Sequence, residues 1–333
     1  MSFSLVTGGA GFIGSHVARQ LLNQGKKVVV LDDLSGGFKD HVPAGAIFIE
    51  GSICDQNLVK KIFKEYAFEA VFHLAAYAAE GLSHFIKHFN YQNNVLGSIN
   101  LINASINSGV KCFVFTSSIA VYGAGQLPMR EDMIPEPEDS YGIAKLAVEQ
   151  ELRVSHEMFG LNYVIFRPHN VYGEQQNIGD KYRNVIGIFM NQIMQDLPVT
   201  IFGDGEQTRA FSYIEEMAET IAESAWNPKA YGEIFNIGAD QPYTVNVLAD
   251  AVFKAMGKNT GKKYLEARNE VKHAYSDHLK AEKLLGYKNT ISLEEGLSRM
   301  AAWAKKAGPR RGKLFENIEV MQKMPESWAK EFL

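Results

Sequence analysis

Residues 7–14 read Thr-Gly-Gly-Ala-Gly-Phe-Ile-Gly, and this stretch decides the fold. A short apolar run precedes it at residues 3–6, and apolar side chains then recur at helical spacing as far as Leu22. A second apolar run, residues 28–31, ends in Asp32-Asp33. The order of elements is therefore strand, glycine turn, helix, strand and acid.

This order of elements is typical of a dinucleotide site. Glycines allow backbone N–H groups at the start of the helix to approach a pyrophosphate. An acid at the end of the second strand accepts the ribose 2′-hydroxyl of NAD and repels the 2′-phosphate of NADP. The alternative is an ordinary glycine-rich turn, which would not need the acid at this offset. We therefore expect NAD as the cofactor, with Asp32 at its ribose.

Further apolar runs alternate with helical stretches along the first half of the chain. They lie at residues 46–49, 70–74, 112–116 and 163–166. These runs are apolar throughout, which is typical of strands buried on both faces of a parallel sheet. The sequence thus predicts an α/β fold with a Rossmann-type doubly wound parallel sheet. Ligands of such sheets bind beyond the carboxyl ends of the strands.

The pattern changes near Val171, where the loops lengthen. Residues 235–238 then have the pattern of a late strand that rejoins the sheet, and helical patterns follow at residues 244–257 and 277–286. We predict that an NAD-binding Rossmann domain comprises residues 1–167 plus about 212–242. A smaller, interleaved α/β substrate domain is expected to comprise residues of about 168–211 plus 243–333.

Composition excludes several classes of protein. The 333 residues carry a formal net charge of −4, so no basic surface for nucleic acid is expected. No apolar run approaches the ~20 residues of a membrane span, and the chain enters a strand at once, so neither a membrane nor a signal peptide is expected. Cys54 and Cys112 have no ligand or redox spacing, which favours a cytoplasmic location. His84 and His88 lack a third ligand at suitable spacing, so no metal is expected.

The residues that suggest chemistry follow the run at 112–116. Ser118 comes two residues after it, and Tyr141 and Lys145 stand four residues apart at the start of a helical stretch, on one helix face. A lysine ammonium and a positively charged nicotinamide nearby would lower the pKa of the phenol. Tyr141 could then take a proton from a substrate hydroxyl that Ser118 holds. The alternative for this tyrosine–lysine pair is the surface of an amphipathic helix.

Taken together, these motifs make the chain resemble the extended short-chain dehydrogenases/reductases, and among them the NAD-dependent nucleotide-sugar epimerases of the UDP-glucose 4-epimerase type. The motifs that carry the resemblance are the glycine stretch at 7–14, His73-Leu74-Ala75-Ala76, Asn94-Val95-Leu96-Gly97, Ser117-Ser118, Tyr141 with Lys145, residues 167–173, residues 203–209 and Asn236-Ile237-Gly238.

The resemblance implies roles for individual residues. The adenosine half of NAD would be held by Gly8, Gly11, Phe12, Ile13, Asp32 and Ile53. Its nicotinamide half would be surrounded by Ala75, Tyr77, Asn94, Lys145 and Pro168. The nucleotide diphosphate of the substrate would be bound by Asn170, Asn184, Val185, Arg209 and Arg268, and its base by Val199, Thr200 and Phe202. Ser118, Tyr141 and Lys145 would be catalytic, with Ser118 also touching the substrate.

Residues 119 and 120 discriminate among the reactions of this family. Sugar dehydratases carry an Asp-Glu pair there and UDP-glucuronate decarboxylases a glutamate, whereas this chain has Ile119-Ala120. The resemblance therefore implies inversion at C4 of a UDP-sugar, of the UDP-glucose/UDP-galactose type, through a transient 4-keto intermediate. The alternatives are a net oxidoreductase such as a sugar reductase or a threonine-dehydrogenase-like enzyme, an epimerase of UDP-glucuronate or GDP-mannose, and an NAD-binding regulator without activity.

Three further expectations come from the same resemblance. A homodimer would form through residues 92–109 and 143–159, two helices from each subunit. Glu80 lies in a segment that would face the sugar. Ala274 would lie against C2 of the sugar and leave room for an N-acetyl group, or would simply be a small residue packed beneath the site.

Overall fold

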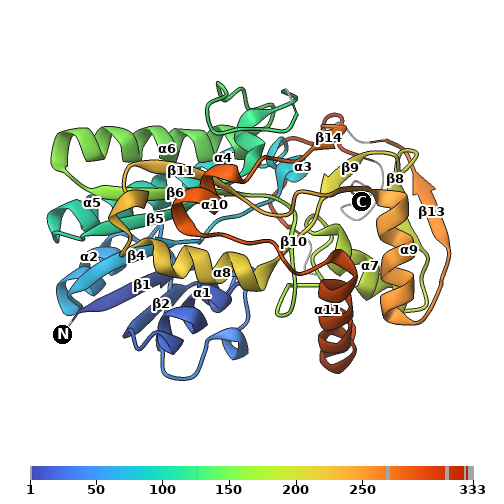
Figure 1. Ribbon diagram of the computed structural model, residues 1–333, viewed down its shortest axis with the longest axis horizontal. Coiled ribbons are helices and arrows are strands. Elements are labelled where there is room, and N and C mark those ends of the chain that lie inside the picture. The colour runs from blue at the N-terminus through green and yellow to red at the C-terminus, as the bar shows by residue number, and fades with distance from the viewer. Residues whose placement is uncertain (1, 126, 268–270, 312–314, 326–327, 329–333) are drawn as a thin grey trace.

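The centre of the protein is a parallel sheet (Figure 1). In the computed structural model, which describes residues 2–125, 127–267, 271–311, 315–325 and 328, this sheet has seven strands in the order β11-β6-β5-β4-β1-β2-β3. Its strands are β1 (Phe3–Thr7), β2 (Val28–Asp32), β3 (Ile47–Glu50), β4 (Phe68–His73), β5 (Cys112–Thr116), β6 (Asn162–Pro168) and β11 (Glu233–Ile237). The predicted Rossmann-type fold is confirmed, and so is the late strand, because β11 pairs in parallel with β6.

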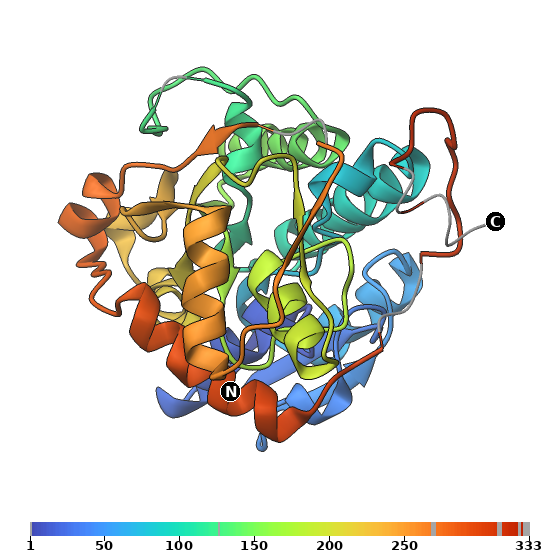
Figure 2. The ribbon, with the colours of Figure 1, turned by 90° about the vertical axis from the view of Figure 1, so that its right-hand side faces the viewer.

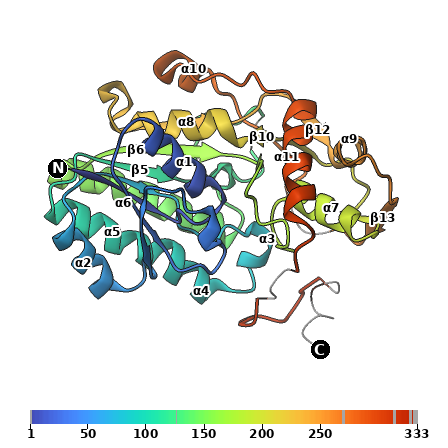
Figure 3. The ribbon, with the colours of Figure 1, turned by 90° about the horizontal axis from the view of Figure 1, so that it is seen from below.

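Helices cover both faces of the sheet because its strands are apolar on both sides (Figure 3). Val28 and Val30 of β2 face one core, and Val29 and Leu31 face the other. The first core is covered by α1 (Phe12–Asn23), α8 (Ile214–Ser224) and α10 (Leu279–Leu285). The second is covered by α2 (Gln56–Glu65), α5 (Gly97–Asn107) and α6 (Ser140–Phe159).

A second region stands beyond the carboxyl ends of the strands, at the right of Figure 1. Its core lies among α7 (Val185–Met194), α9 (Val245–Met256) and α11 (Leu293–Ala307). Small sheets complete it, formed by β7 (Val171–Tyr172) with β10 (Ser212–Tyr213), by β8 (Val199–Phe202) with β13 (Lys262–Leu265), and by β12 (Pro242–Thr244), β9 (Thr208–Ala210) and β14 (His273–Ala274). Residues of both regions line one cleft between them.

The helix α10 falls within residues 243–333, the range predicted for the substrate domain. Ala281 of this helix and Tyr287 after it pack in the first core of the main sheet. A helix of this length has an apolar side whose partner the periodicity of the sequence does not specify. The division of the chain into two domains stays a prediction.

The C-terminal strap, residues 315–325 with Trp328, runs back over α3 (Glu80–Ser83) and α4 (Lys87–Tyr91) (Figure 2). The ring of Phe315 lies 5.3 Å from that of Tyr77. Glu319 accepts the backbone N–H groups of His88 and Phe89 at 2.7 and 2.9 Å, which caps α4. Trp328 packs edge-on against Tyr182 at 5.3 Å. The strap therefore ties Tyr77 and Tyr182, which line the cleft, to each other.

Within the described residues, no helix combines the length and the apolar character that crossing a membrane requires.

Candidate active site

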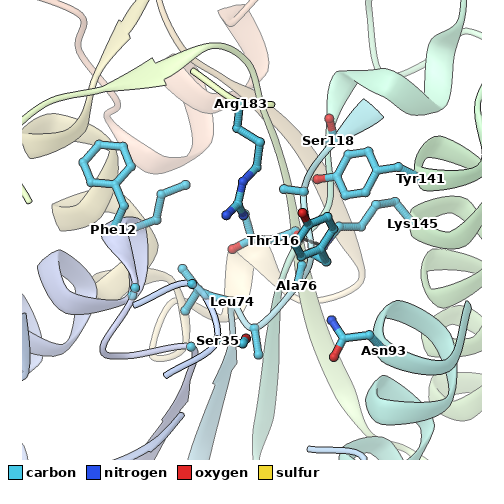
Figure 4. Close-up of a pocket in the computed structure, with 18 of the residues that line it drawn as sticks. Phe12, Ser35, Leu74, Ala76, Asn93, Thr116, Ser118, Tyr141, Lys145 and Arg183 are labelled. Atoms are coloured by element: carbon cyan, nitrogen blue, oxygen red, sulfur yellow. Dashed lines mark hydrogen bonds between the residues drawn. The ribbon is translucent and has the colours of Figure 1, made fainter. Parts of the chain in front are cut away.

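A cavity of about 440 Å³ lies beyond the carboxyl ends of the parallel strands, where this type of sheet binds its ligands (Figure 4). A smaller cavity of about 170 Å³ extends it into the second region. The two cavities share Glu80, Asn170, Val171 and Asn184 along their walls. Together they form one elongated cleft with a sheet end and a second-region end.

At the sheet end, the chain comes close to itself around the glycine turn between β1 and α1. A Cβ atom on Gly14 would lie 2.1 Å from the carbonyl oxygen of Gly8. Gly8 has φ +70, and a Cβ there would lie 2.7 Å from the backbone nitrogen of Ala75. Side chains at these positions would therefore clash with backbone, so the turn needs glycine. All the residues predicted to hold the adenosine half of NAD line the cavity, namely Gly8, Gly11, Phe12, Ile13, Asp32 and Ile53.

Asp32 closes this end of the cavity from the tip of β2. Its carboxylate accepts the backbone N–H of Ala10 at 3.0 Å and that of Leu34 at 2.8 Å. Burial raises the pKa of Asp32, and these two hydrogen bonds oppose the rise. The acid is thus held in place by the glycine turn itself, with its carboxylate in the cavity wall.

Tyr141, Lys145 and Ser118 meet where the cavity widens (Figure 4). The first two lie on one face of α6, whose start is capped by Asp139 through the N–H of Gly142 at 2.8 Å. Ser118 follows β5 and lies beside Tyr141 in the cavity wall, where its hydroxyl opposes the rise of the pKa of Tyr141. Lys145 donates to the carbonyl oxygen of Thr116 at 2.8 Å. The structure therefore brings together the three residues predicted to be catalytic.

The protonation of these groups differs from the expectation. Burial raises the pKa of Tyr141 and the negative charge of Glu80 adds to the rise, so the phenol is protonated in the protein alone. Burial also lowers the pKa of Lys145 to about 7. Its ammonium group lies 5.6 Å from the centre of the tyrosine ring and donates to a backbone carbonyl instead. The predicted lowering of the phenol pKa depends on the bound nicotinamide as well as on this lysine.

Glu149 is a buried acid that the sequence analysis missed. It lies one helical turn after Lys145, and its charge raises the pKa of that lysine, in part opposing the effect of burial. Its carboxylate accepts the hydroxyl of Ser117 at 2.5 Å and Nε of Arg167 at 2.9 Å. The two charged side chains are only 1% and 2% exposed. The spacing of 141, 145 and 149, four residues each, is the signal that could have revealed it.

Around the predicted nicotinamide position, Ala75, Tyr77 and Pro168 line the cavity. Asn94 lies behind this wall, because its side chain is engaged by the main chain of Tyr77. Its Oδ1 accepts the N–H of Tyr77 at 2.8 Å and its Nδ2 donates to the carbonyl of Tyr77 at 3.1 Å. The structure thus gives Asn94 the role of positioning Tyr77, while the neighbouring Asn93 lines the cavity (Figure 4).

At the second-region end, Asn170 and Asn184 adopt left-handed backbone conformations with φ 41 and φ 63. The other predicted substrate residues in the wall are Val185, Thr200, Phe202 and Arg209. Val199 instead packs in the core of the second region. Arg209 donates to the carbonyl oxygens of Thr208, Val271 and Lys272 at 2.8, 2.6 and 3.0 Å. Arg268 lies outside the described residues.

Arg183 is a charged side chain in the cleft that the sequence analysis did not predict. It points into the open space between Phe12 and Tyr141 (Figure 4). Its Nε donates to Asp180 at 2.7 Å, and its guanidinium lies 5.0 Å from the ring centre of Tyr77. A lone arginine in a polar loop has no sequence signature, so only the fold reveals its position.

Two remaining expectations concern the sugar and metals. Ala274 is buried in a cluster with Ile119, Val121, Tyr122 and Met129, which agrees with a small residue packed beneath the site. The described part of the chain contains no group of three or more His, Cys, Asp or Glu side chains arranged to hold a metal ion.

Comparison with known proteins places the chain in a family. The model of the NAD dependent epimerase/dehydratase family matches residues 4–238. The chain belongs to the NAD-dependent epimerase/dehydratase family. A putative UDP-glucose 4-epimerase of Methanocaldococcus jannaschii is 37% identical over 305 residues, which cover 90% of this chain and 98% of that protein. The predicted resemblance is thereby confirmed.

Solved structures of the family agree. The UDP-glucose 4-epimerase of Thermotoga maritima with UDP-glucose has a TM-score of 0.88 and 36% identity, covering 91% of this chain and 99% of that one. The UDP-glucuronic acid 4-epimerase of Bacillus cereus, in complex with UDP-glucuronic acid and NAD, has a TM-score of 0.83 and 31% identity, covering 91% and 99%. The chain is an enzyme of this epimerase/dehydratase family, and its cofactor is NAD.

The sheet end of the cleft fits that cofactor. The glycine turn lets the backbone pack tightly at the start of α1, because a Cβ at Gly8 or Gly14 would clash with backbone atoms, and the start of a helix attracts phosphate. Asp32 places a carboxylate at the end of β2, where folds of this type bind the ribose of the dinucleotide. In this epimerase/dehydratase chain, Gly8, Gly11 and Asp32 would hold the adenosine half, and Lys145 and Tyr77 would border the nicotinamide half.

Proposed function

We propose that this enzyme inverts C4 of a UDP-sugar, of the UDP-glucose/UDP-galactose type, through a 4-keto intermediate. The observation that carries the proposal is that Tyr141, Lys145 and Ser118 line one cavity, next to residues 119 and 120, which cannot ionise. Elimination and decarboxylation need an acid or base at the latter positions in related enzymes, whereas reversible oxidation at C4 needs only a proton acceptor beside the cofactor.

The chain's own residues divide the work as follows. Ser118 holds the C4 hydroxyl, and Tyr141 removes its proton and returns it after the sugar has turned over. Lys145 lies beside the tyrosine, and the charge of Glu149 favours its protonated form against burial. NAD, when bound, supplies the acceptor and donor of hydride at the same carbon. Asn170, Asn184 and Arg209 hold the nucleotide diphosphate, so that the sugar alone is free to rotate.

One observation favours UDP-glucuronate as a second candidate substrate. The guanidinium of Arg183 lies in the cleft near Tyr141 and Tyr77, and a guanidinium binds a carboxylate in bidentate fashion. Asp180 already neutralises this charge in part, which favours the neutral sugar. The two candidates differ by a carboxylate at C6 only, so they share the proposed proton transfer.

The experiment is incubation of the purified enzyme with UDP-glucose, UDP-galactose, UDP-N-acetylglucosamine, UDP-glucuronate and GDP-mannose in separate samples. Epimer ratios are read by NMR, and the absorbance of reduced nicotinamide is followed in parallel. We expect C4 epimers of the neutral UDP-sugars without net reduction of NAD. Net reduction would point to an oxidoreductase, and turnover of none of the sugars, with NAD bound, would point to a regulator.

We also propose a homodimer formed through α5 and α6, together with the turn at Gln92–Leu96 before α5. Large apolar side chains are exposed there, namely Leu96, Ile143, Val154 and Met158. Those on α6 recur at helical spacing, so they form one stripe that a second copy would cover. Sedimentation of Val154→Lys/Met158→Lys should give a monomer. Val247→Lys, at an exposed position of α9, is the matched control that should leave the dimer intact.

A further inference from the structure

Two buried histidines meet behind the second-region end of the cleft. His169 follows β6, between Pro168 and Asn170 of the cavity wall, and His278 immediately precedes α10. Their Nε2 atoms are 3.1 Å apart and the rings lie nearly parallel, at 27°. Both side chains are buried among the elements that join the sheet to the second region.

The outer nitrogens of the two rings also have partners. His278 Nδ1 lies 2.6 Å from a carboxylate oxygen of Asp240, and His169 Nδ1 lies 3.0 Å from the carbonyl oxygen of Ala210. Neither oxygen can donate a hydrogen bond, so both Nδ1 atoms must carry protons. A hydrogen bond between the two Nε2 atoms needs a third proton. Two neutral imidazoles carry only two protons. All three hydrogen bonds can therefore form when the histidine pair holds one extra proton, whose charge is balanced by the carboxylate of Asp240.

The position of the carboxylate assigns the extra proton to one ring. Asp240 lies against His278 Nδ1, whereas His169 has only a carbonyl oxygen at its Nδ1, and burial lowers the pKa of His169 to about 3. The hydrogen bond from His278 in turn lowers the pKa of Asp240. The hydroxyl of Ser276 lies 3.1 Å from His278 Nε2. The remaining ionisable group that packs against this ring is Tyr287, whose hydroxyl donates to the carbonyl of Gly238 at 2.9 Å.

The hydrogen-bonded array of His169, His278 and Asp240 adjoins the proposed nucleotide site. Asn170 follows His169 and holds a left-handed φ of 41, a conformation that costs a non-glycine residue free energy unless its surroundings impose it. Ser212 imposes it from one side, donating to the carbonyl of His169 at 2.8 Å and to the carbonyl of Asn170 from its own N–H at 3.2 Å. The ring of His169, the residue before Asn170, is held by the carbonyl of Ala210 and by His278. Ala210, the second anchor, directly follows Arg209.

We propose that His278, as an imidazolium paired with Asp240, is a positioning residue for the nucleotide. Through His169 it fixes the backbone that carries Asn170, and through Ala210 the backbone that carries Arg209. Gly238 makes room for the array, because a Cβ there would lie 2.4 Å from His169 Nε2. This inference rests on the proposed substrate role of Asn170 and Arg209.

The test combines a spectrum with a binding measurement. Nitrogen-15 NMR of histidine-labelled enzyme should show both ring nitrogens of His278 protonated at neutral pH. Calorimetry with UDP should give a dissociation constant about tenfold higher for His278→Gln, with the bound NAD retained. In the wild type, UDP affinity should fall with rising pH, and this fall should be missing from the variant. His156→Gln, a histidine of α6 away from the cleft, is the matched control and should behave as wild type.

Asp240→Asn keeps both rings and covers the case in which His278→Gln does not fold. It should return His278 to a neutral ring and weaken UDP binding by a similar factor. Wild-type affinity and pH dependence in either variant, or a neutral His278 in the wild-type spectrum, would overturn the inference. If wild-type enzyme bound no UDP, the proposed nucleotide site would be wrong, and the spectrum alone would still decide whether the imidazolium exists.

Discussion

The two ends of the cleft are built differently. At the sheet end, the glycine turn and Asp32 come from one continuous stretch, and the charged side chains behind them are paired with each other, as Glu149 is with Arg167. At the second-region end, the wall comes from segments far apart in the chain, and Arg209 is held by backbone carbonyls. The comparison teaches that the cofactor end is formed by local structure, whereas the substrate end depends on how distant segments pack.

Tyr141→Phe tests the border between the two ends and should have the largest effect. Removing the hydroxyl takes away the proton acceptor, so turnover should fall by about 10²–10⁴-fold. Both ends keep their own contacts, so NAD content and UDP affinity should stay as in wild type. Turnover is measured by NMR and NAD by its release on denaturation. Tyr163→Phe, in β6 and the second core, is the control, and turnover near that of wild type in Tyr141→Phe would contradict the assignment.

Glu149→Ala should weaken the sheet end by leaving Arg167 buried without its counter-charge. Loss of one partner of a buried ion pair costs about 3–5 kcal/mol in the free energy of unfolding. Urea denaturation measures it. The control is Glu157→Ala on the same helix, whose pair with Arg153 is exposed and contributes about 0.3–0.5 kcal/mol. Equal losses from both substitutions would show that the buried pair contributes no more than a surface pair.

Asp32→Ala and Arg209→Ala should separate the two ends. Each removes a hydrogen bond to or from a charged group, a loss of about 1.5–3 kcal/mol, which corresponds to roughly 10–100-fold in affinity. Asp32→Ala should weaken NAD, relax the preference against NADP and leave UDP binding unchanged. Arg209→Ala should do the reverse. Calorimetry with each ligand is the measurement, and a variant that lost both ligands equally would show that the ends are not independent.

Lys145→Met should have its effect in the pH dependence of stability. Burial lowers the pKa of Lys145 to about 7, whereas a lysine in the unfolded chain titrates near 10.4. Between these values the unfolded chain binds more protons, so this group's contribution to stability rises with pH there and is least favourable below about pH 7.

Lys145→Met removes that dependence. Relative to wild type, the variant should therefore be more stable at about pH 6 than at about pH 10. Urea denaturation at the two pH values measures the difference. A wild-type-minus-variant difference that is the same at both pH values would contradict a lowered pKa for this lysine.

The cofactor end could be predicted because its signals are local. Glycines, a strand and an acid within about thirty residues of sequence indicate the turn without any knowledge of the rest of the fold. The sheet could be predicted for the same reason, because a strand that is buried on both faces is a continuous apolar run in the sequence. The structure confirms it. Glu149 was accessible by spacing alone, but its partner Arg167 lies on β6, and only the packing of α6 on the sheet shows that they meet.

The substrate end was less predictable because a family resemblance identifies a segment but does not specify which way each of its side chains points. Val199 and Thr200 are neighbours on β8 and so point to opposite sides, one into the core and one into the cleft. Asn94 has the residue type expected for a ligand contact, yet the main chain of Tyr77 engages its amide. Arg183 has no local signature, because its place in the cleft follows from the path of the loop before α7.

The position of the C-terminal strap has a consequence for biosynthesis. Strands β1 to β6 lie within the first 168 residues, so most of the sheet leaves the ribosome early. At about 5–20 residues per second, the rest of the chain takes roughly 10–30 s more to appear. During this interval the nascent chain carries its glycine turn and Asp32 but lacks most of the second region and the strap that ties Tyr77 to Tyr182. The glycine turn and acid expected to hold the cofactor are therefore synthesised before Asn170, Asn184 and Arg209, which are expected to hold the sugar nucleotide.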